Sequence, residues 1–292
     1  MPRALPVGAA LAVAAAPLAL AAGAAAVPAR HEAAACTAAR LPVIHSGVLT
    51  LATENPAFPP WFGGGVRSGS PWKVSDPASG KGYESAVARA VALRLGFAPS
   101  AVRWVAVPFS AALRPGRKSF DIFVNQVSIT SRRARDVDFS SSYYNVSQSI
   151  VAVDGRRIAA VRSVAGLKRF RLGAQAGSTS LDVITATIRP TRRPRAYGTN
   201  TQAVSALKEG RIDGLVVDLP TGYYVSAVQV PNGKIIGQFR PAGTPERFGM
   251  VLAKGSGLTS CVNRAIAELR ADGTIARLEE RWLAGAAAPV LR

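Results

Sequence analysis

Histidine, cysteine and acidic residues are all scarce in this chain. Its 292 residues include only two histidines and two cysteines. No arrangement of Cys, His and Asp suits nucleophilic chemistry, and no cluster of metal-ligating residues is visible in the sequence. These absences argue against an enzyme, and we expect no metal ion or other cofactor.

Acidic residues are outnumbered by basic ones. Lysine and arginine total 36 against 17 aspartates and glutamates, which gives a formal net charge of +19. Such a balance is typical of proteins that bind nucleic acid or an anionic surface. The arginines are scattered, however, and neither a basic stripe interleaved with aromatics nor an RNP-like motif is present. We therefore expect no nucleic-acid partner and interpret the charge as attraction to an acidic cell envelope.

Only one long apolar run occurs, and it is N-terminal. Arg3 precedes residues 5–27, which are rich in Ala, Leu and Val and end in small residues, as in a signal peptide. The alternative is a membrane anchor, but Pro6, Pro17 and Gly23 interrupt the run. We predict a signal peptide and disordered N-terminus over residues 1–35, followed by a soluble exported protein, extracellular or periplasmic.

The remaining 48% hydrophobic and 18% charged composition is that of a globular protein, long enough for one large domain or two lobes. Export makes a disulfide between Cys36 and Cys261 plausible. The alternative is that Cys36 is lipid-acylated, but residues 33–35 lack the usual leucine, and His31 and Glu32 separate the cysteine from the apolar run. We favour the disulfide.

Residues 120–144 carry the most informative pattern. The apolar run 121–124 predicts a buried strand that ends at polar residues, Asn125 and Gln126. Polar groups at the C-terminal edge of such a strand lie where ligands bind in open α/β sheets. Arg133 follows nearby hydroxyls, and a guanidinium beside hydroxyls is suited to a carboxylate. The alternative is a solvated basic helix start.

This stretch resembles the family 3 extracellular solute-binding proteins, the amino-acid-binding subunits of ABC importers. The family pattern has a polar pair after a strand, an S/T-I-T step, an arginine, V-D-F-S and an aromatic hinge. The corresponding residues here are Asn125-Gln126, Ser128-Ile129-Thr130, Arg133, 137–140 and Tyr143-Tyr144. The resemblance covers roughly residues 47–283 and is strongest to binders of polar or basic amino acids.

The resemblance implies an α/β fold of the two-lobed type II periplasmic-binding-protein kind. Lobe 1 would comprise residues 36–147 and a return segment, 241–285, lobe 2 residues 148–240, and a tail residues 286–292. A ligand would close the lobes about the hinges. We expect strands at 47–53, 102–107, 121–124, 149–153, 172–175, 214–218 and 248–252, and helices at 84–95, 201–207, 260–270 and 274–283.

An amino acid carries an ammonium and a carboxylate on one carbon, so its site must supply opposite charges at a fixed separation. The resemblance implies that Arg133, Ser128 and the backbone near Thr179 bind the carboxylate. Hydroxyls after a glycine also indicate a helix N-terminus suited to an anion, capped by Ser178 or Ser180.

The resemblance also implies that the ammonium binds Asp218. This acid stands at the end of a buried strand, where packing does not explain it. A carbonyl at Asn125 would help, and Gln126, where the family often has glycine, narrows the site. The side-chain pocket would consist of Glu54, Asn55, Phe58, Phe109, Gln126 and Gln175.

An acid and several amides favour a polar or cationic ligand, with arginine, lysine or glutamine leading. If Asn55 faces the cleft instead of Glu54, glutamine gains over arginine. We thus predict a monomeric binding protein that delivers the amino acid to ABC-transporter permease subunits. The alternative is a small-carboxylate dehydratase on the same fold.

Overall fold

The computed structural model describes residues 36–240, 243–285 and 287–292. The predicted signal peptide and N-terminus, residues 1–35, lie outside these ranges. Within them, no helix combines the length and the apolar character that crossing a membrane requires.

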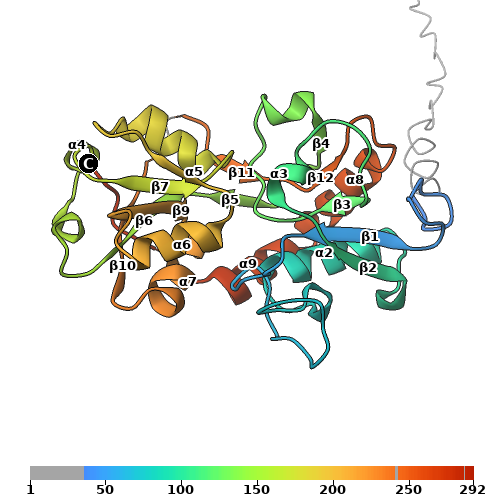
Figure 1. Ribbon diagram of the computed structural model, residues 1–292. Helices are drawn as coiled ribbons and strands as arrows, with labels where there is room; N and C mark the ends of the chain where they lie inside the picture. Colours follow the sequence, from blue (N-terminus) through green and yellow to red (C-terminus); the bar gives the residue numbers. More distant parts are fainter. Residues whose placement is uncertain (1–35, 241–242, 286) are drawn as a thin grey trace, which may run out of the picture. The chain divides into compact units, whose positions relative to one another are not determined.

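The first of two five-stranded sheets has the order β2-β1-β3-β12-β4 (Figure 1). Strands β2 and β3 run parallel to β1, whereas β12 runs antiparallel to both β3 and β4. With its helices this sheet forms the unit called lobe 1 below. Its elements are β1 (Leu49–Thr53), α2 (Tyr83–Arg94), β2 (Val102–Ala106), α3 (Phe109–Ala112), β3 (Ile122–Phe123), β4 (Val137–Phe139), β12 (Val251–Ala253), α8 (Thr259–Ala271) and α9 (Thr274–Leu283).

The second sheet has the order β10-β6-β9-β7-β8 and forms lobe 2 with its helices. Strand β7 is parallel to β8 and β9, and β6 is antiparallel to β9 and β10. Its elements are β6 (Gln148–Val153), α4 (Val164–Leu167), β7 (Leu172–Gln175), α5 (Thr179–Asp182), β8 (Arg195–Tyr197), α6 (Asn200–Lys208), β9 (Gly214–Asp218), α7 (Leu219–Tyr224) and β10 (Gly233–Gln238).

A two-stranded ribbon joins the lobes. Strand β5 (Tyr144–Val146) pairs antiparallel with β11 (Glu246–Phe248), and Figure 1 shows this ribbon between the two sheets. Trp61 packs edge-on against Tyr144 and Phe248, with ring centroids 5.6 and 5.7 Å away. We call β5 and β11 the hinge ribbon.

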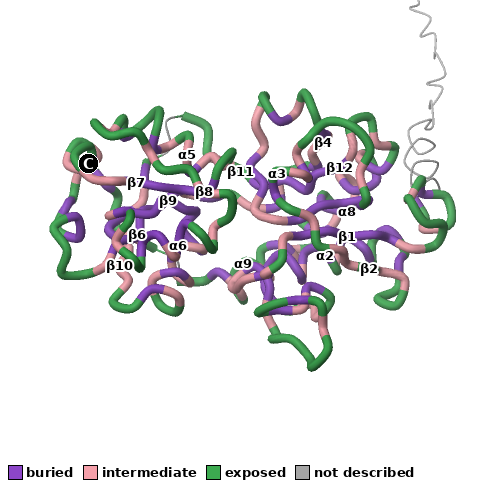
Figure 2. The backbone as a smooth tube through the Cα atoms, in the orientation of Figure 1, coloured by how far each residue is buried: buried purple, intermediate pink, exposed green. Residues whose placement is uncertain are grey.

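The central strands are buried in both lobes, as the purple segments of Figure 2 show for β1 and β9. Every residue of β1 and β9 is buried, which explains why their sequences read as continuous apolar runs. In lobe 1, Gly82 (φ 90°) allows α2 to start against the loop after β1, because a Cβ there would lie 2.6 Å from Phe62 Cα. The centres of both sheets are thus buried, and the polar groups lie at strand ends and in the loops that follow them.

One predicted strand, residues 248–252, is wrong as a single element. The structure divides it into the end of β11 and the start of β12, with Gly249 and Met250 between them. Gly249 passes so close to Ile129 that a Cβ would lie 2.8 Å from its Cγ1. The chain therefore changes from the hinge ribbon to the lobe 1 sheet at a residue with no side chain to collide with Ile129.

The C-terminal tail packs on lobe 2. Its described residues, 287–292, pack on lobe 2, where Val290 forms a bridge with Gln238 and Leu291 is buried. The backbone N–H of Val164 also donates to the Arg292 carbonyl over 2.8 Å. The tail thus follows α9 of lobe 1 but adds to the core of lobe 2.

A disulfide connects Cys36 to Cys261 on α8, with the two Cα atoms 5.4 Å apart. Both cysteines are buried in the lobe 1 core. The bond therefore fixes the start of the described chain to a helix that is 225 residues away in the sequence.

Replacing both cysteines by serine, Cys36→Ser with Cys261→Ser, should lower the free energy of unfolding by about 2–5 kcal/mol, because the unfolded chain regains a very long open loop. Urea denaturation of the variant and of wild type under non-reducing conditions measures this difference. Reduced wild type should match the variant, and equal midpoints for oxidised wild type and the variant would show that the bond adds no stability.

Candidate functional site

A cavity of about 340 Å³ lies between residues of both lobes, and all the residues predicted to bind ligand line it. These are Glu54, Asn55, Phe58, Phe109, Asn125, Gln126, Ser128 and Arg133 from lobe 1, and Gln175, Ser178, Thr179 and Asp218 from lobe 2. The structure therefore brings the predicted set together, and their roles toward a ligand remain predictions.

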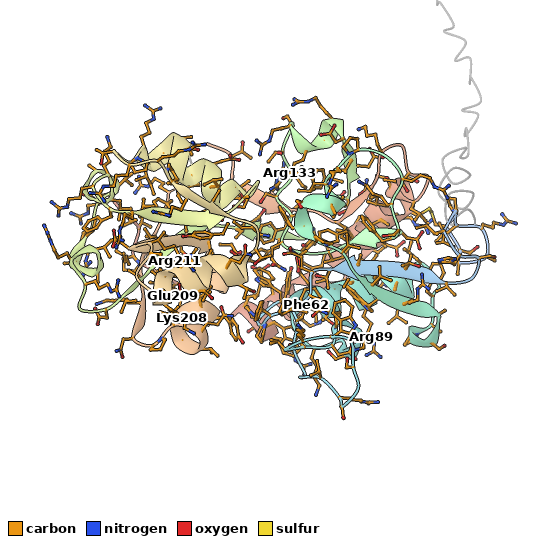
Figure 3. The ribbon with its side chains drawn as sticks, in the orientation of Figure 1. Phe62, Arg89, Arg133, Lys208, Glu209 and Arg211 are labelled. Carbon is orange, nitrogen blue, oxygen red and sulfur yellow. A yellow bond between two sulfur atoms is a disulfide. The ribbon has the colours of Figure 1, made fainter. Side chains whose placement is uncertain are left out.

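Arg133 is the buried cation of the cavity, on the lobe 1 side (Figure 3). Its Nη1 donates to the Ser128 carbonyl at 2.7 Å and its Nη2 to the Gly177 carbonyl of lobe 2 at 2.8 Å. The guanidinium also lies over the Phe109 ring, 5.3 Å from its centroid. These contacts orient the group and leave several of its N–H donors for another acceptor.

No carboxylate in the described part of the chain lies within ion-pair distance of Arg133. Burial lowers the pKa of Arg133 to about 10, so it stays charged at neutral pH. A buried charge without a partner is costly, and a ligand carboxylate would compensate it. Arg132 and Arg135 are exposed, so the alternative of a solvated basic helix start applies to them. It does not apply to the buried Arg133.

Asp218 is the buried anion on the lobe 2 side. It ends β9 and caps α7, because its Oδ1 accepts from the Thr221 N–H at 2.9 Å and its Oδ2 from the Thr221 hydroxyl at 2.8 Å. Burial raises its pKa to about 6, so the carboxylate is mostly ionised at neutral pH. Like Arg133, it has no ion-pair partner among the residues that the structure describes.

Glu54, rather than Asn55, presents its polar atoms to the pocket. Its Oε1 accepts from the Phe109 N–H at 3.0 Å and from Gln175 Nε2 at 3.5 Å. Burial raises the pKa of Glu54. The Asn55 amide instead bonds the loop beside it, donating to the Pro71 carbonyl at 2.8 Å and accepting from the Lys73 N–H at 2.9 Å.

Sequence reasoning missed Glu84, on which the pose of Gln126 depends. The fully buried Glu84 carboxylate accepts from the Gln126 N–H at 2.7 Å, from the Gln126 side-chain amide and from the Tyr143 hydroxyl. Burial raises the pKa of Glu84 to about 7. The Gln126 side chain therefore bonds inward to Glu84. Glu84 lies in the first turn of α2, and that position alone does not predict a contact with Gln126.

Sequence reasoning also missed Glu246 on the hinge ribbon. Its Oε1 accepts from the Ser128 hydroxyl at 2.5 Å and the Thr179 hydroxyl at 2.6 Å, one from each lobe. A hydroxyl has a single proton, so these two protons are already directed to Glu246. The side-chain donors that remain for a ligand carboxylate belong mainly to Arg133.

Residues Ser178, Thr179 and Ser180 at the start of α5 also line the cavity. Ser178 is the cap, since its hydroxyl accepts from the Leu181 N–H at 3.2 Å, whereas the Ser180 hydroxyl donates to Gln148 Oε1 at 2.7 Å. Phe58 packs against Tyr224 of lobe 2, with ring centroids 5.9 Å apart, and both residues line the cavity.

No group of three or more His, Cys, Asp or Glu residues within the described ranges could hold a metal ion.

Comparison with known proteins places the chain in a family. The model of the bacterial extracellular solute-binding proteins, family 3, matches residues 65–285, and the chain belongs to this family. It is 28% identical over 164 residues to the ABC transporter glutamine-binding protein GlnH of Bacillus subtilis, a match that covers 56% of this chain and 58% of that protein. A second curated relative is covered over 60% of its length, so the chain spans only part of such relatives.

Solved structures agree on the two-lobed fold. The chain resembles an ancestral arginine-binding protein bound to arginine, with a TM-score of 0.64 and 28% identity over 81% of this chain and 98% of that one. A structure of an ancestral arginine-binding protein bound to glutamine is similar at 27% identity, with a TM-score of 0.64 over 82% of this chain and 98% of that one.

We expect Glu84→Gln to lower the free energy of unfolding by about 1–3 kcal/mol, because one carboxylate oxygen becomes a second buried donor facing the Gln126 and Tyr143 donors. Since folding raises the pKa of Glu84 from its ordinary 4.5 to about 7, wild type gains stability from this group as the pH falls from 8 to 5. The variant should lack that part of the gain. Urea denaturation at both pH values tests this, and an identical pH dependence in both proteins would contradict it.

Proposed function

We propose that this protein captures an amino acid between its lobes and delivers it to the permease subunits of an ABC importer. One observation carries the proposal: a buried cation, Arg133, and a buried anion, Asp218, line the same cavity from opposite lobes, and neither has an ion-pair partner among the described residues. A zwitterionic amino acid supplies the missing carboxylate and ammonium together.

A ligand held this way would bridge the lobes and favour their closure about the hinge ribbon. Family membership supports an exported protein, and the names of its relatives describe binding proteins, so we propose binding and not catalysis. We further propose that it acts as a monomer.

We propose a polar or cationic side chain for the ligand, with arginine, lysine and glutamine as the leading candidates. Glu54 and Gln175 supply acceptors at the end of the cavity where Phe109 gives an apolar wall. A guanidinium or ammonium would compensate the charge of the half-buried Glu54, and an amide would satisfy Gln175. The similarity to proteins bound to arginine and to glutamine supports this range.

Arg133→Ala and Asp218→Ala should each weaken arginine binding by roughly 2–5 kcal/mol, because each leaves one buried charge of the ligand unpaired. Isothermal titration calorimetry measures the loss. The matched control is Arg135→Ala, which removes an exposed arginine of the same turn and should bind like wild type. If the two cavity variants also titrate like wild type, the ligand binds elsewhere.

Glu54→Gln tests the side-chain preference. We expect it to weaken arginine binding about tenfold, or 1.4 kcal/mol, while sparing glutamine, because only the cation loses a charged partner. Competition titrations with arginine and glutamine on one protein preparation give the ratio of the two dissociation constants. This ratio does not depend on the fraction of the protein that is active. Equal effects on the two ligands would place the Glu54 carboxylate away from the side chain, and tighter wild-type binding of leucine or glutamate would refute the proposed preference.

A further inference from the structure

Trp61 makes a hydrogen bond that crosses from one lobe to the other. It lies in the loop after β1, is 2% exposed, and donates from Nε1 to the Thr221 hydroxyl oxygen at 2.8 Å. Thr221 belongs to the first turn of α7, 160 residues further along the chain. A buried indole N–H needs an acceptor, and lobe 2 provides this one.

The hinge ribbon holds the indole ring in place. Besides Tyr144 and Phe248, Tyr83 packs edge-on against Trp61 with a centroid distance of 6.1 Å. Two of these three aromatic partners are on the hinge ribbon itself. The direction of the N–H is therefore set by the part of the molecule about which the lobes would move.

The Thr221 hydroxyl has only one proton, and this fixes which partner donates in the Trp61–Thr221 hydrogen bond. The single Thr221 hydroxyl proton is donated to Asp218 Oδ2 at 2.8 Å, so the hydroxyl oxygen is left to accept from Trp61. Thr221 also donates its backbone N–H to the other Asp218 oxygen. A chain of donors thus runs from Trp61 through Thr221 to Asp218, and each bond in such a chain strengthens the next.

We propose that Trp61 is a positioning residue through which lobe 1 orients and stabilises the Asp218 carboxylate when the lobes are together. The inference rests on the proposed function, because it assigns to Asp218 the ammonium of the ligand. Closure about the hinge would then improve ammonium binding through a residue that does not itself have to touch the ligand.

The surroundings of Asp218 leave this donor chain as its main source of stabilisation. The titratable groups that face it are Glu246 on β11, Glu84 on α2, and Tyr143 and Tyr144 at the hinge. A glutamate in its ionised form opposes the charge of Asp218, and burial raises the pKa values of both tyrosines, so they stay neutral. The bonds from Thr221 lower the pKa of Asp218 against the larger effect of burial.

Trp61→Phe tests the inference, because it keeps an aromatic ring in the hinge cluster and removes the N–H. The matched control is Trp282→Phe, since the buried Trp282 Nε1 has no hydrogen-bond partner among the described residues. Titration calorimetry with arginine, lysine and glutamine from pH 5 to 8 is carried out on both variants and wild type. We expect Trp61→Phe to weaken binding about three- to tenfold at pH 7 and Trp282→Phe to leave it unchanged.

The pH profile separates positioning from a general loss of packing. Wild-type affinity should fall as Asp218 becomes protonated at low pH, and in Trp61→Phe this fall should begin at higher pH. Thr221→Val breaks the donor chain without touching the aromatic cluster and should shift the profile in the same direction. Trp61→Phe and Thr221→Val interrupt the same series of hydrogen bonds. The double variant should therefore bind the amino acid no more weakly than Thr221→Val alone.

Each outcome bears on a different claim. Equal affinity and pH profile for Trp61→Phe and Trp282→Phe, or additive effects in the double variant, would overturn the inference while leaving the proposed function in place. A wild-type protein that binds none of the three amino acids would overturn the proposed function, and the inference with it.

Discussion

The buried carboxylate of Glu84 connects helix α2, the end of strand β3 and the start of the hinge ribbon. It accepts from the Gln126 backbone just beyond β3 and from the Tyr143 hydroxyl just before β5. A buried carboxylate is tolerated only when donors surround it, so these segments have to meet at one point. The strand end that carries Asn125 and Ser128 is placed by this contact, and the cavity wall follows from it.

The two lobes divide the recognition of opposite charges between them. Arg133 is held by the carbonyls of Ser128 and Gly177, and Asp218 is held by both donors of Thr221. Neither arrangement neutralises its charge, whereas half-buried ion pairs such as Arg171 with Asp213 do so elsewhere on lobe 2. The cavity therefore holds two charges that no opposite charge of the protein compensates. Their separation determines which ligand can compensate both.

Local patterns in the sequence predicted the elements and the lining residues of the cavity. Asp218 ends a buried strand and Arg133 comes after one, and their place at a sheet edge can be read from a few neighbouring residues. The partners of Glu84, Glu246 and Trp61 are up to 160 residues away, and no local pattern encodes such contacts. The break at Gly249 was missed for the same reason, because the crowding comes from Ile129.

The C-terminal tail makes a third connection between the lobes. Leu283 belongs to the lobe 1 core at the end of α9, and Val290 pairs with β10 of lobe 2. Seven residues of extended chain reach at most about 25 Å. As long as Leu283 and Val290 both stay packed, this maximum reach limits how far the two lobes can separate at that point. Any label or fusion partner placed after Arg292 would travel with lobe 2.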